Sequence, residues 1–164
     1  MKHLWAPWRM EYIRQKKDSD KGCVFCNKSK EENNDKDNLV LLRGQESFVL
    51  MNLYPYSNGH LMVAPYKHLD TFELMSKSCM NEIMNLSTKS MEIIKKKLNS
   101  DGFNFGANIG KAGGAGIEDH IHFHIVPRWI GDTNFMPVVG QTKVIIGGLV
   151  ETYDELKYNF DKLK

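Results

Sequence analysis

The sequence predicts an α+β domain with a single antiparallel sheet of about five strands, one long helix packed on a face of the sheet and a short C-terminal helix. Short runs rich in strand-forming residues stand on both sides of one stretch with helical spacing. At 164 residues, the chain is long enough for one domain with a core and too short for two of ordinary size. We therefore expect one domain over residues 1–164.

The first half of the predicted sheet is an antiparallel meander. Three apolar runs follow one another, at 39–42, 48–52 and 60–64. Gly44 and the turn-rich segment 54–59 separate them. Residues 27–38 carry no apolar side chain, so we expect a solvated loop there, and a separate N-terminal arm before it.

A helical period begins at Asp70, which together with Glu73 is typical of a helix N-cap and its partner. The predicted helix ends at 101–102, with a break near 76–78. Cys79 lies on this helix and is interpreted as a small buried apolar side chain.

Two more strands are predicted after the helix, at 103–109 and 119–126, on either side of the glycine-rich loop 110–116. Pro127 closes the second strand. Residues 151–164 predict a short amphipathic helix with one apolar side, made of Tyr153, Leu156, Phe160 and Leu163.

Composition and charge exclude several classes of partner. The formal net charge is +2, from 22 basic and 20 acidic residues that are interspersed, so no basic face for a polymeric nucleic acid is expected. No apolar stretch is long enough to span a bilayer, and the N-terminus is too charged for a signal-peptide core. We expect a cytoplasmic protein with no membrane partner.

The chemistry is concentrated in His120, His122 and His124, which alternate along a predicted strand. Alternate side chains of a strand point to the same side, so the three imidazoles share one face while Ile121 and Phe123 pack into the core. Polar residues on an exposed face, or a zinc site made of histidines alone, are alternatives. Neither gives the neighbouring glycine loop a role, whereas glycines let backbone N–H groups approach an anion.

This motif, followed by two apolar residues and Pro127-Arg128, resembles that of the histidine-triad superfamily. The segments 47–52 and 59–65 resemble its first hairpin, and Asn108 with the loop 112–116 resembles its phosphate-binding stretch. The segments 5–12 and 127–135 are similar, more narrowly, to the branch that contains bacterial diadenosine tetraphosphate phosphorylases. The resemblance covers nearly the whole chain, with 1–38 as arm and polar loop, 39–132 as catalytic core and 133–164 as C-terminal extension.

The resemblance implies a role for each matching residue. His122 is the catalytic nucleophile and His124 its catalytic partner. The substrate-binding positions are Asn52 for the ribose, His60 as the fourth histidine, Asn108 for a phosphate oxygen, and the backbone of Ala115, Gly116 and Ile117. The chemistry agrees with these roles, because a phosphoanhydride carries negative oxygens and is best attacked by an uncharged nucleophile, such as neutral imidazole.

The glycine loop departs from the family pattern. Gly116, Ile117, Glu118 and Asp119 stand where the family commonly has Gln, or Ser and Thr. Backbone contacts to the leaving group are therefore favoured over side-chain contacts. We expect the carboxylates of Glu118 and Asp119 to point away from a polyphosphate.

A second site is predicted at Cys23-x-x-Cys26, a spacing that serves zinc sites and redox pairs alike. Some bacterial histidine-triad proteins complete a zinc site with the histidine of a Pro-x-x-His segment and the first triad histidine, which here are His68 and His120. The resemblance thus implies a structural zinc on Cys23, Cys26, His68 and His120, with no cofactor required for the chemical step. Two reduced cysteines that pack the arm are the alternative.

The resemblance implies a nucleotidyl hydrolase or transferase that cleaves dinucleoside polyphosphates of the diadenosine tetraphosphate type through a covalent nucleotidyl-histidine intermediate. Phosphate or water is the second acceptor, and an AMP-type nucleotide is a further ligand. A nucleotide-binding interaction protein with incidental hydrolysis of nucleoside phosphoramidates is the alternative. The family also implies a homodimer formed through edge strands.

Overall fold

The computed structural model describes residues 22–132 and 147–163. The predicted arm and C-terminal extension therefore lie partly outside the described residues. The elements, in chain order, are α2 (Val24–Lys30), β1 (Val40–Arg43), β2 (Ser47–Met51), β3 (Leu61–Pro65), the 3-10 helix η2 (Phe72–Leu74), α3 (Lys77–Leu98), β4 (Gly102–Ala107), β5 (Phe123–Arg128) and α5 (Leu149–Asp161). Across these two ranges, no helix is both long enough and apolar enough to cross a membrane.

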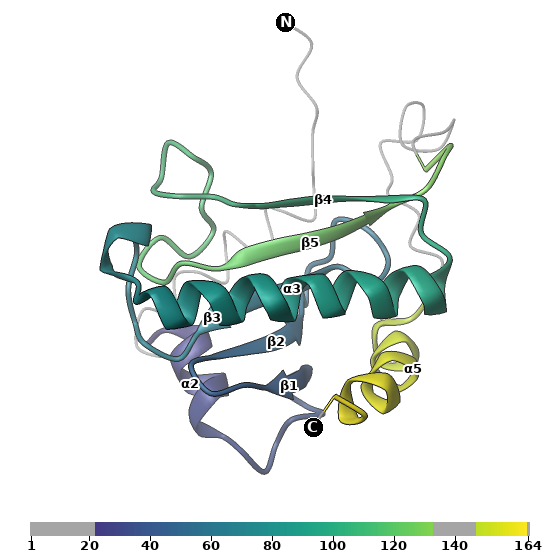
Figure 1. Cartoon of the computed structure of the whole chain (residues 1–164), viewed down its shortest axis with the longest axis horizontal. Coiled ribbons are helices and arrows are strands. Elements are labelled where there is room, and N and C mark those ends of the chain that lie inside the picture. The colour runs from purple at the N-terminus through teal and green to yellow at the C-terminus, as the bar shows by residue number, and fades with distance from the viewer. Residues whose placement is uncertain (1–21, 133–146, 164) are drawn as a thin grey trace, which may run out of the picture.

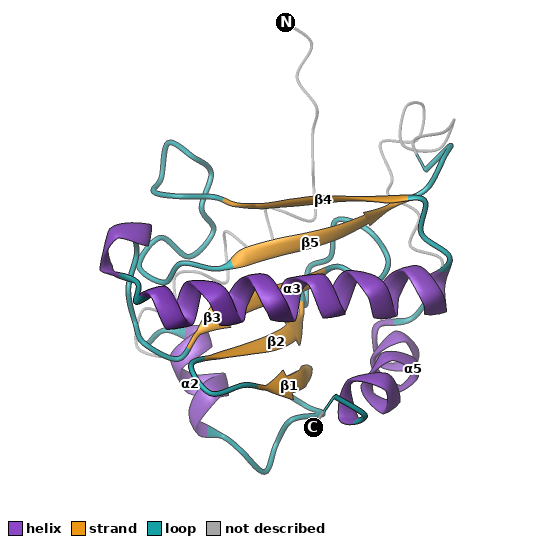
Figure 2. Cartoon of the chain, viewed as in Figure 1, coloured by secondary structure: helices purple, strands orange, loops and turns teal. Residues whose placement is uncertain are grey.

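The five strands form one antiparallel sheet in the order β1-β2-β3-β5-β4 (Figure 2). The register pairs Leu61 with Ile125 and Met62 with His124, which brings the hairpin β2–β3 beside the triad strand. The predicted fold class is confirmed. The strand that follows α3, β4, takes the outer edge, and β5 returns between β4 and β3 (Figure 1).

Helix α3 lies across one face of the sheet, and α5 packs beside β1 (Figure 1). The main core fills this side, with strand residues such as Val49, Val63 and Ile125 packed against Ile83 and Ile94 of α3. The alternate strand residues, including Phe48 and Leu50, form a smaller cluster with Phe25 of α2. Strands β1, β2 and β3 are therefore buried on both faces, with α2 on the face opposite α3, whereas β4 is largely exposed.

The long helix begins later than predicted. Ser76 is its N-cap, and the Ser76 hydroxyl accepts a hydrogen bond from the Cys79 N–H at 3.1 Å. The expected cap at Asp70 is wrong, because residues 72–74 form a separate 3-10 turn that ends before Ser76. Asn99 is the C-cap of this helix and adopts the left-handed conformation, two residues before the predicted end. Cys79 is buried, as predicted.

Other boundaries also differ from the sequence prediction, most of them by one or two residues. Residues 27–30 belong to α2 and not to a loop, because Phe25 is fully buried and holds the helix against the sheet. The triad strand begins at Phe123 and includes Pro127, which pairs with Phe103 of β4 and lies beyond the pairing with β3. Leu163 follows the end of α5 and is exposed, whereas Tyr153, Leu156 and Phe160 are buried as predicted.

Candidate functional site

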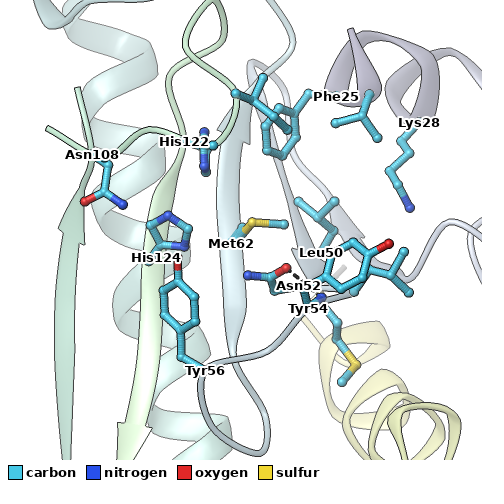
Figure 3. Close-up of a pocket in the computed structure, with 16 residues that line it drawn as sticks. Phe25, Lys28, Leu50, Asn52, Tyr54, Tyr56, Met62, Asn108, His122 and His124 are labelled. Carbon is cyan, nitrogen blue, oxygen red and sulfur yellow. Dashed lines mark hydrogen bonds between the residues drawn. The ribbon is translucent and has the colours of Figure 1, made fainter. Parts of the chain in front are cut away.

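A cleft opens on the face of the sheet that carries α2 (Figure 3). Predicted site residues line it: Asn52, Asn108, Gly116, Ile117, His122 and His124. Further lining residues come from α2, from β2 and β3, and from the loop between these two strands: Val24, Phe25, Lys28, Leu50, Met51, Leu53, Tyr54, Tyr56 and Met62. The cleft therefore combines a polar group of histidines and amides with an extended apolar wall.

The hydrogen bond of His122 determines which of its ring nitrogens is free. Nδ1 of His122 lies 2.9 Å from the backbone carbonyl oxygen of His120. A carbonyl oxygen only accepts, so Nδ1 carries the proton and Nε2 keeps its lone pair. Burial lowers the pKa of His122, although this hydrogen bond acts to raise it, so the ring is neutral at pH 7. His122 thus presents an uncharged, basic nitrogen.

His124, the second histidine of the cleft, has the opposite tautomer to His122, and its hydrogen bond with His60 determines this. The Tyr56 N–H donates to Nδ1 of His60 at 3.0 Å, so in neutral His60 the proton is on Nε2. That Nε2 lies 3.0 Å from Nδ1 of His124, which must accept, and the proton of His124 is therefore on its own Nε2. Burial, and then the charge of His122, lower the pKa of His124 to about 4. His124 is thus a neutral hydrogen-bond donor beside His122, at 4.8 Å between ring centroids.

His60 lies behind the cleft, in contact with the lining residues His124, Asn52 and Tyr56. It is fully buried and is not part of the cleft lining given above, although we expected it among the substrate-binding residues. Asn52 is half-buried and lines the cleft, and its side-chain oxygen accepts from the Tyr54 N–H at 3.0 Å (Figure 3). Its amide nitrogen lies 3.3 Å from Nδ1 of His60.

The glycine loop brings backbone to the cleft. Gly114 has a φ of 83°, which residues with a Cβ rarely adopt. It lines the cleft together with Gly116. A Cβ at Gly113 would collide with the Ile109 carbonyl oxygen, so the tight loop requires glycine there. Ala115 is half-buried and, unlike its neighbours, is not part of the lining. Glu118 and Asp119 are not among the residues that line the cleft, and the direction of their carboxylates relative to a polyphosphate stays a prediction.

The four predicted metal ligands lie together. One donor atom from each of Cys23, Cys26, His68 and His120 falls within 4.8 Å of all the others. Sγ of Cys23 is 3.3 Å and Sγ of Cys26 is 3.6 Å from Nδ1 of His120, and Sγ of Cys26 is 3.4 Å from Nδ1 of His68. A tetrahedral zinc with ordinary bond lengths places sulfur and nitrogen ligands about 3.6 Å apart. The cluster therefore has the donors and the size to bind a metal ion.

His120 connects this cluster to the sheet. Its Nε2 lies 2.9 Å from the Pro65 carbonyl oxygen at the end of β3, so Nε2 carries the proton and Nδ1 faces the sulfur atoms. The same residue supplies the carbonyl oxygen that orients His122. The metal cluster and the cleft thus share one residue.

Sequence reasoning missed the contribution of α2. Phe25 packs on both His120 and His122, with ring centroids 5.1 and 4.7 Å apart, and it lines the cleft with Lys28. The one feature of the sequence that could have indicated this contribution is Phe25, an aromatic residue between two predicted metal ligands. Its i+3 neighbour Lys28 lies on the same side of the helix.

Comparisons with known proteins agree with this geometry. The family model of the HIT domain matches residues 33–129, more than half of the chain. An AP-4-A phosphorylase of Mycobacterium tuberculosis (strain CDC 1551 / Oshkosh) is 36% identical over 150 residues, which cover 88% of this chain and 77% of the relative. A bis(5'-adenosyl)-triphosphatase of Dictyostelium discoideum is 30% identical over 82 residues, 50% of this chain and 54% of that one. The expectation of a family that contains nucleotide-cleaving enzymes is confirmed by these names.

Solved structures share the fold. A Zn-bound histidine triad family protein from Mycobacterium smegmatis superposes with a TM-score of 0.68 at 22% identity, covering 87% of this chain and 95% of that chain. A Plasmodium falciparum diadenosine triphosphate hydrolase has a TM-score of 0.61 at 18% identity, covering 85% and 98%. Together with the family match and the triad geometry, these likenesses assign the chain to the HIT (histidine-triad) family.

Proposed function

We propose that this chain is a nucleotidyl-transfer enzyme that cleaves dinucleoside polyphosphates of the diadenosine tetraphosphate type through a covalent intermediate on His122. The observation that carries the proposal is the pair of opposite tautomers in the cleft. His122 offers a lone pair and His124 offers an N–H hydrogen-bond donor, both on neutral rings. A nucleophile beside a donor for the leaving oxygen suits the cleavage of a phosphoanhydride.

The reaction proceeds in two displacements. Nε2 of His122 forms a bond to the phosphorus of the bound nucleotidyl group, and the bond from that phosphorus to the bridging oxygen breaks. The polyphosphate leaves as an anion, and its departing oxygen accepts a hydrogen bond from Nε2–H of His124, which keeps its proton. Inorganic phosphate or water then attacks the same phosphorus and the P–N bond breaks, which restores the neutral His122. When water is the acceptor, the proton that it loses passes to solvent.

Other lining residues hold the substrate. Asn52 contacts the ribose, and Asn108 and the backbone N–H groups of Gly116 and Ile117 contact phosphate oxygens. The N–H of Ala115, which we also expected at the phosphate, instead donates to the Gly110 carbonyl oxygen at 3.2 Å. His60 acts as a positioning residue, since its Nε2–H fixes the tautomer of His124. The name of the Mycobacterium tuberculosis relative supports phosphate as the second acceptor. The name of the Dictyostelium relative supports cleavage of a dinucleoside polyphosphate, here a triphosphate.

We also propose that the metal cluster binds zinc in a structural role. Two thiolates and two imidazoles are a set that zinc prefers, and four protein ligands leave no open position for water. Zinc would fix the start of α2, and with it Phe25, against His120 and His122. The chemical step needs no metal.

The third element of the proposal is a homodimer that pairs through β4. The other edge strand, β1, is blocked by α5, because the Tyr153 hydroxyl donates to the Val40 carbonyl at 3.0 Å and Lys157 to the Leu41 carbonyl at 2.9 Å. The outer edge of β4 has no strand neighbour among the described residues, and Phe105 on β4 is 37% exposed. The cytoplasmic location stays a prediction.

The first test is a turnover assay on diadenosine tetraphosphate with and without inorganic phosphate. Wild type should cleave it, with ADP as a product when phosphate is the acceptor and AMP when water is. His122→Ala should lower turnover roughly a thousandfold or more, with nucleotide affinity changed by less than about threefold, because the contacts that hold the nucleotide come from other residues.

The control is His122→Gly with added imidazole, which should recover part of the activity because free imidazole can occupy the place of the missing ring. Substantial activity in His122→Ala would contradict the mechanism. A wild type that binds nucleotide but turns over none of these substrates would favour the interaction protein instead.

The second test concerns the metal. Replacing Cys23 and Cys26 by serine should remove one zinc per chain and lower the melting temperature by roughly 5 °C or more. Cys79→Ser is the matched control, since it removes a buried thiol outside the cluster and should leave the zinc content unchanged. Metal analysis of protein purified in reductant without chelator decides the matter. Absence of stoichiometric zinc in wild type, or zinc that persists in the double variant, would show that the ligands are assigned wrongly.

The third test concerns assembly. Light scattering at micromolar concentration should give twice the mass of one chain, and Phe105→Asp, which places a charge on the exposed β4 edge, should shift the protein toward one chain. A single-chain mass for the wild type would rule out the dimer.

A further inference from the structure

Lys28 is a cation in the apolar wall of the cleft. It follows Phe25 by one helical turn on α2, and its Nζ donates to the Asn38 carbonyl oxygen at 2.6 Å. Burial lowers the pKa of its ammonium group, against the opposing charge of Glu31. In the part of the chain that the structure describes, the Asn38 oxygen is the one hydrogen-bond partner of this ammonium. Two of its three N–H groups are therefore available to a ligand.

Lys28 lies away from the proposed phosphate end. Figure 3 shows Asn108 and His122 on one side of the cleft, Asn52 between, and Lys28 with Tyr54 on the other side. Two groups that lie apart in one view are at least that far apart in the molecule. Lys28 is therefore not placed to contact the phosphorus that His122 attacks.

The walls near Lys28 suit a nucleobase. Val24 and Phe25 of α2 face the cleft together with Leu50 and Leu53, which form apolar surface for the flat faces of a ring. Such surface does not distinguish one base from another, because every base has an apolar face. Discrimination requires a polar group at the edge of the ring, and Lys28 is the cation in this wall.

The geometry of a purine determines which edge reaches Lys28. The ribose is attached at N9, and position 6 lies across the ring system from it. With phosphorus at His122 and ribose at Asn52, the edge farthest from the sugar extends toward the far end of the cleft. A lysine only donates hydrogen bonds. Guanine has the acceptors O6 and N7 on this edge, whereas adenine has an amino group at position 6, which is itself a donor.

We propose that Lys28 is a specificity-determining residue that reads the base and favours purines with a carbonyl at position 6. The inference rests on the proposed function, since it takes the cleft to be the nucleotide site. It predicts that guanine nucleotides bind at least as well as adenine nucleotides. The charge-assisted bond to O6 provides the difference, because N7 is an acceptor in both bases.

The test compares the dissociation constants of GMP and AMP for wild type and for Lys28→Met, measured by calorimetry on the full chain. Methionine keeps most of the length and removes the charge. The ratio of AMP to GMP dissociation constants should fall by about tenfold in Lys28→Met, chiefly through weaker GMP binding. Because both nucleotides are measured on the same sample, the ratio does not depend on the folded fraction.

Lys30→Met is the matched control, because Lys30 is an exposed lysine of the same helix that does not line the cleft. It should leave the ratio unchanged. Lys28→Arg keeps a cationic donor and should retain most of the preference for GMP.

The outcomes separate the two proposals. Failure of both nucleotides to bind wild type would overturn the proposed function. Binding of both with an unchanged ratio in Lys28→Met would overturn the role of Lys28. An equal loss for both nucleotides would show that Lys28 contacts phosphate or ribose, and this would also overturn it.

Discussion

The hydrogen bond from Nδ1 of His122 to the His120 carbonyl oxygen is the interaction on which the proposed chemistry depends. At 2.9 Å, it directs the proton to one ring nitrogen and leaves the other as a base. Its acceptor is itself held in place, because the His120 ring donates to the Pro65 carbonyl at the end of β3. The position of the nucleophile therefore depends on the sheet through one intervening residue.

Helix α2 is a short helix that is held in place by contacts with other parts of the chain. Seven residues form a weak helix in isolation. Its start lies at the cysteine cluster, and its end is held by Arg43 of β1, whose guanidinium donates to the carbonyl oxygens of Lys28, Ser29 and Glu31. Phe25 between them packs on the triad. One wall of the cleft therefore lies between the cluster of Cys23, Cys26, His68 and His120 at one end and an arginine at the other.

The sequence allowed the sheet, the long helix and the triad face to be predicted, because each has a period that burial imposes. Ile121, Phe123 and Ile125 alternate into the main core, as expected for an extended segment that packs on one side. The cluster of Cys23, Cys26, His68 and His120 was predicted from the family resemblance. No local pattern in the sequence indicates that His68 and His120 approach Cys23.

Other features depend on tertiary contacts and have no local signal. Asp70 has the residue type of a helix cap, yet Ser76 is the cap, because the chain makes a separate turn at 72–74 before α3 begins. The polar residues at 27–30 join a helix because Phe25 is buried and Arg43 satisfies the last carbonyls. His60 matches a family position, but its place behind His124 depends on the pairing of β3 with β5.

We propose that His122 carries the nucleotidyl group covalently. The most direct test of this intermediate is the stereochemical course of the reaction at phosphorus. A dinucleoside polyphosphate made chiral at the attacked phosphorus, by sulfur or by oxygen isotopes, is converted and the configuration of the nucleotide product is determined. Two successive in-line displacements, the first by His122 and the second by phosphate or water, each invert the centre, and the account predicts overall retention. Overall inversion would mean a single direct displacement and would contradict the intermediate on His122.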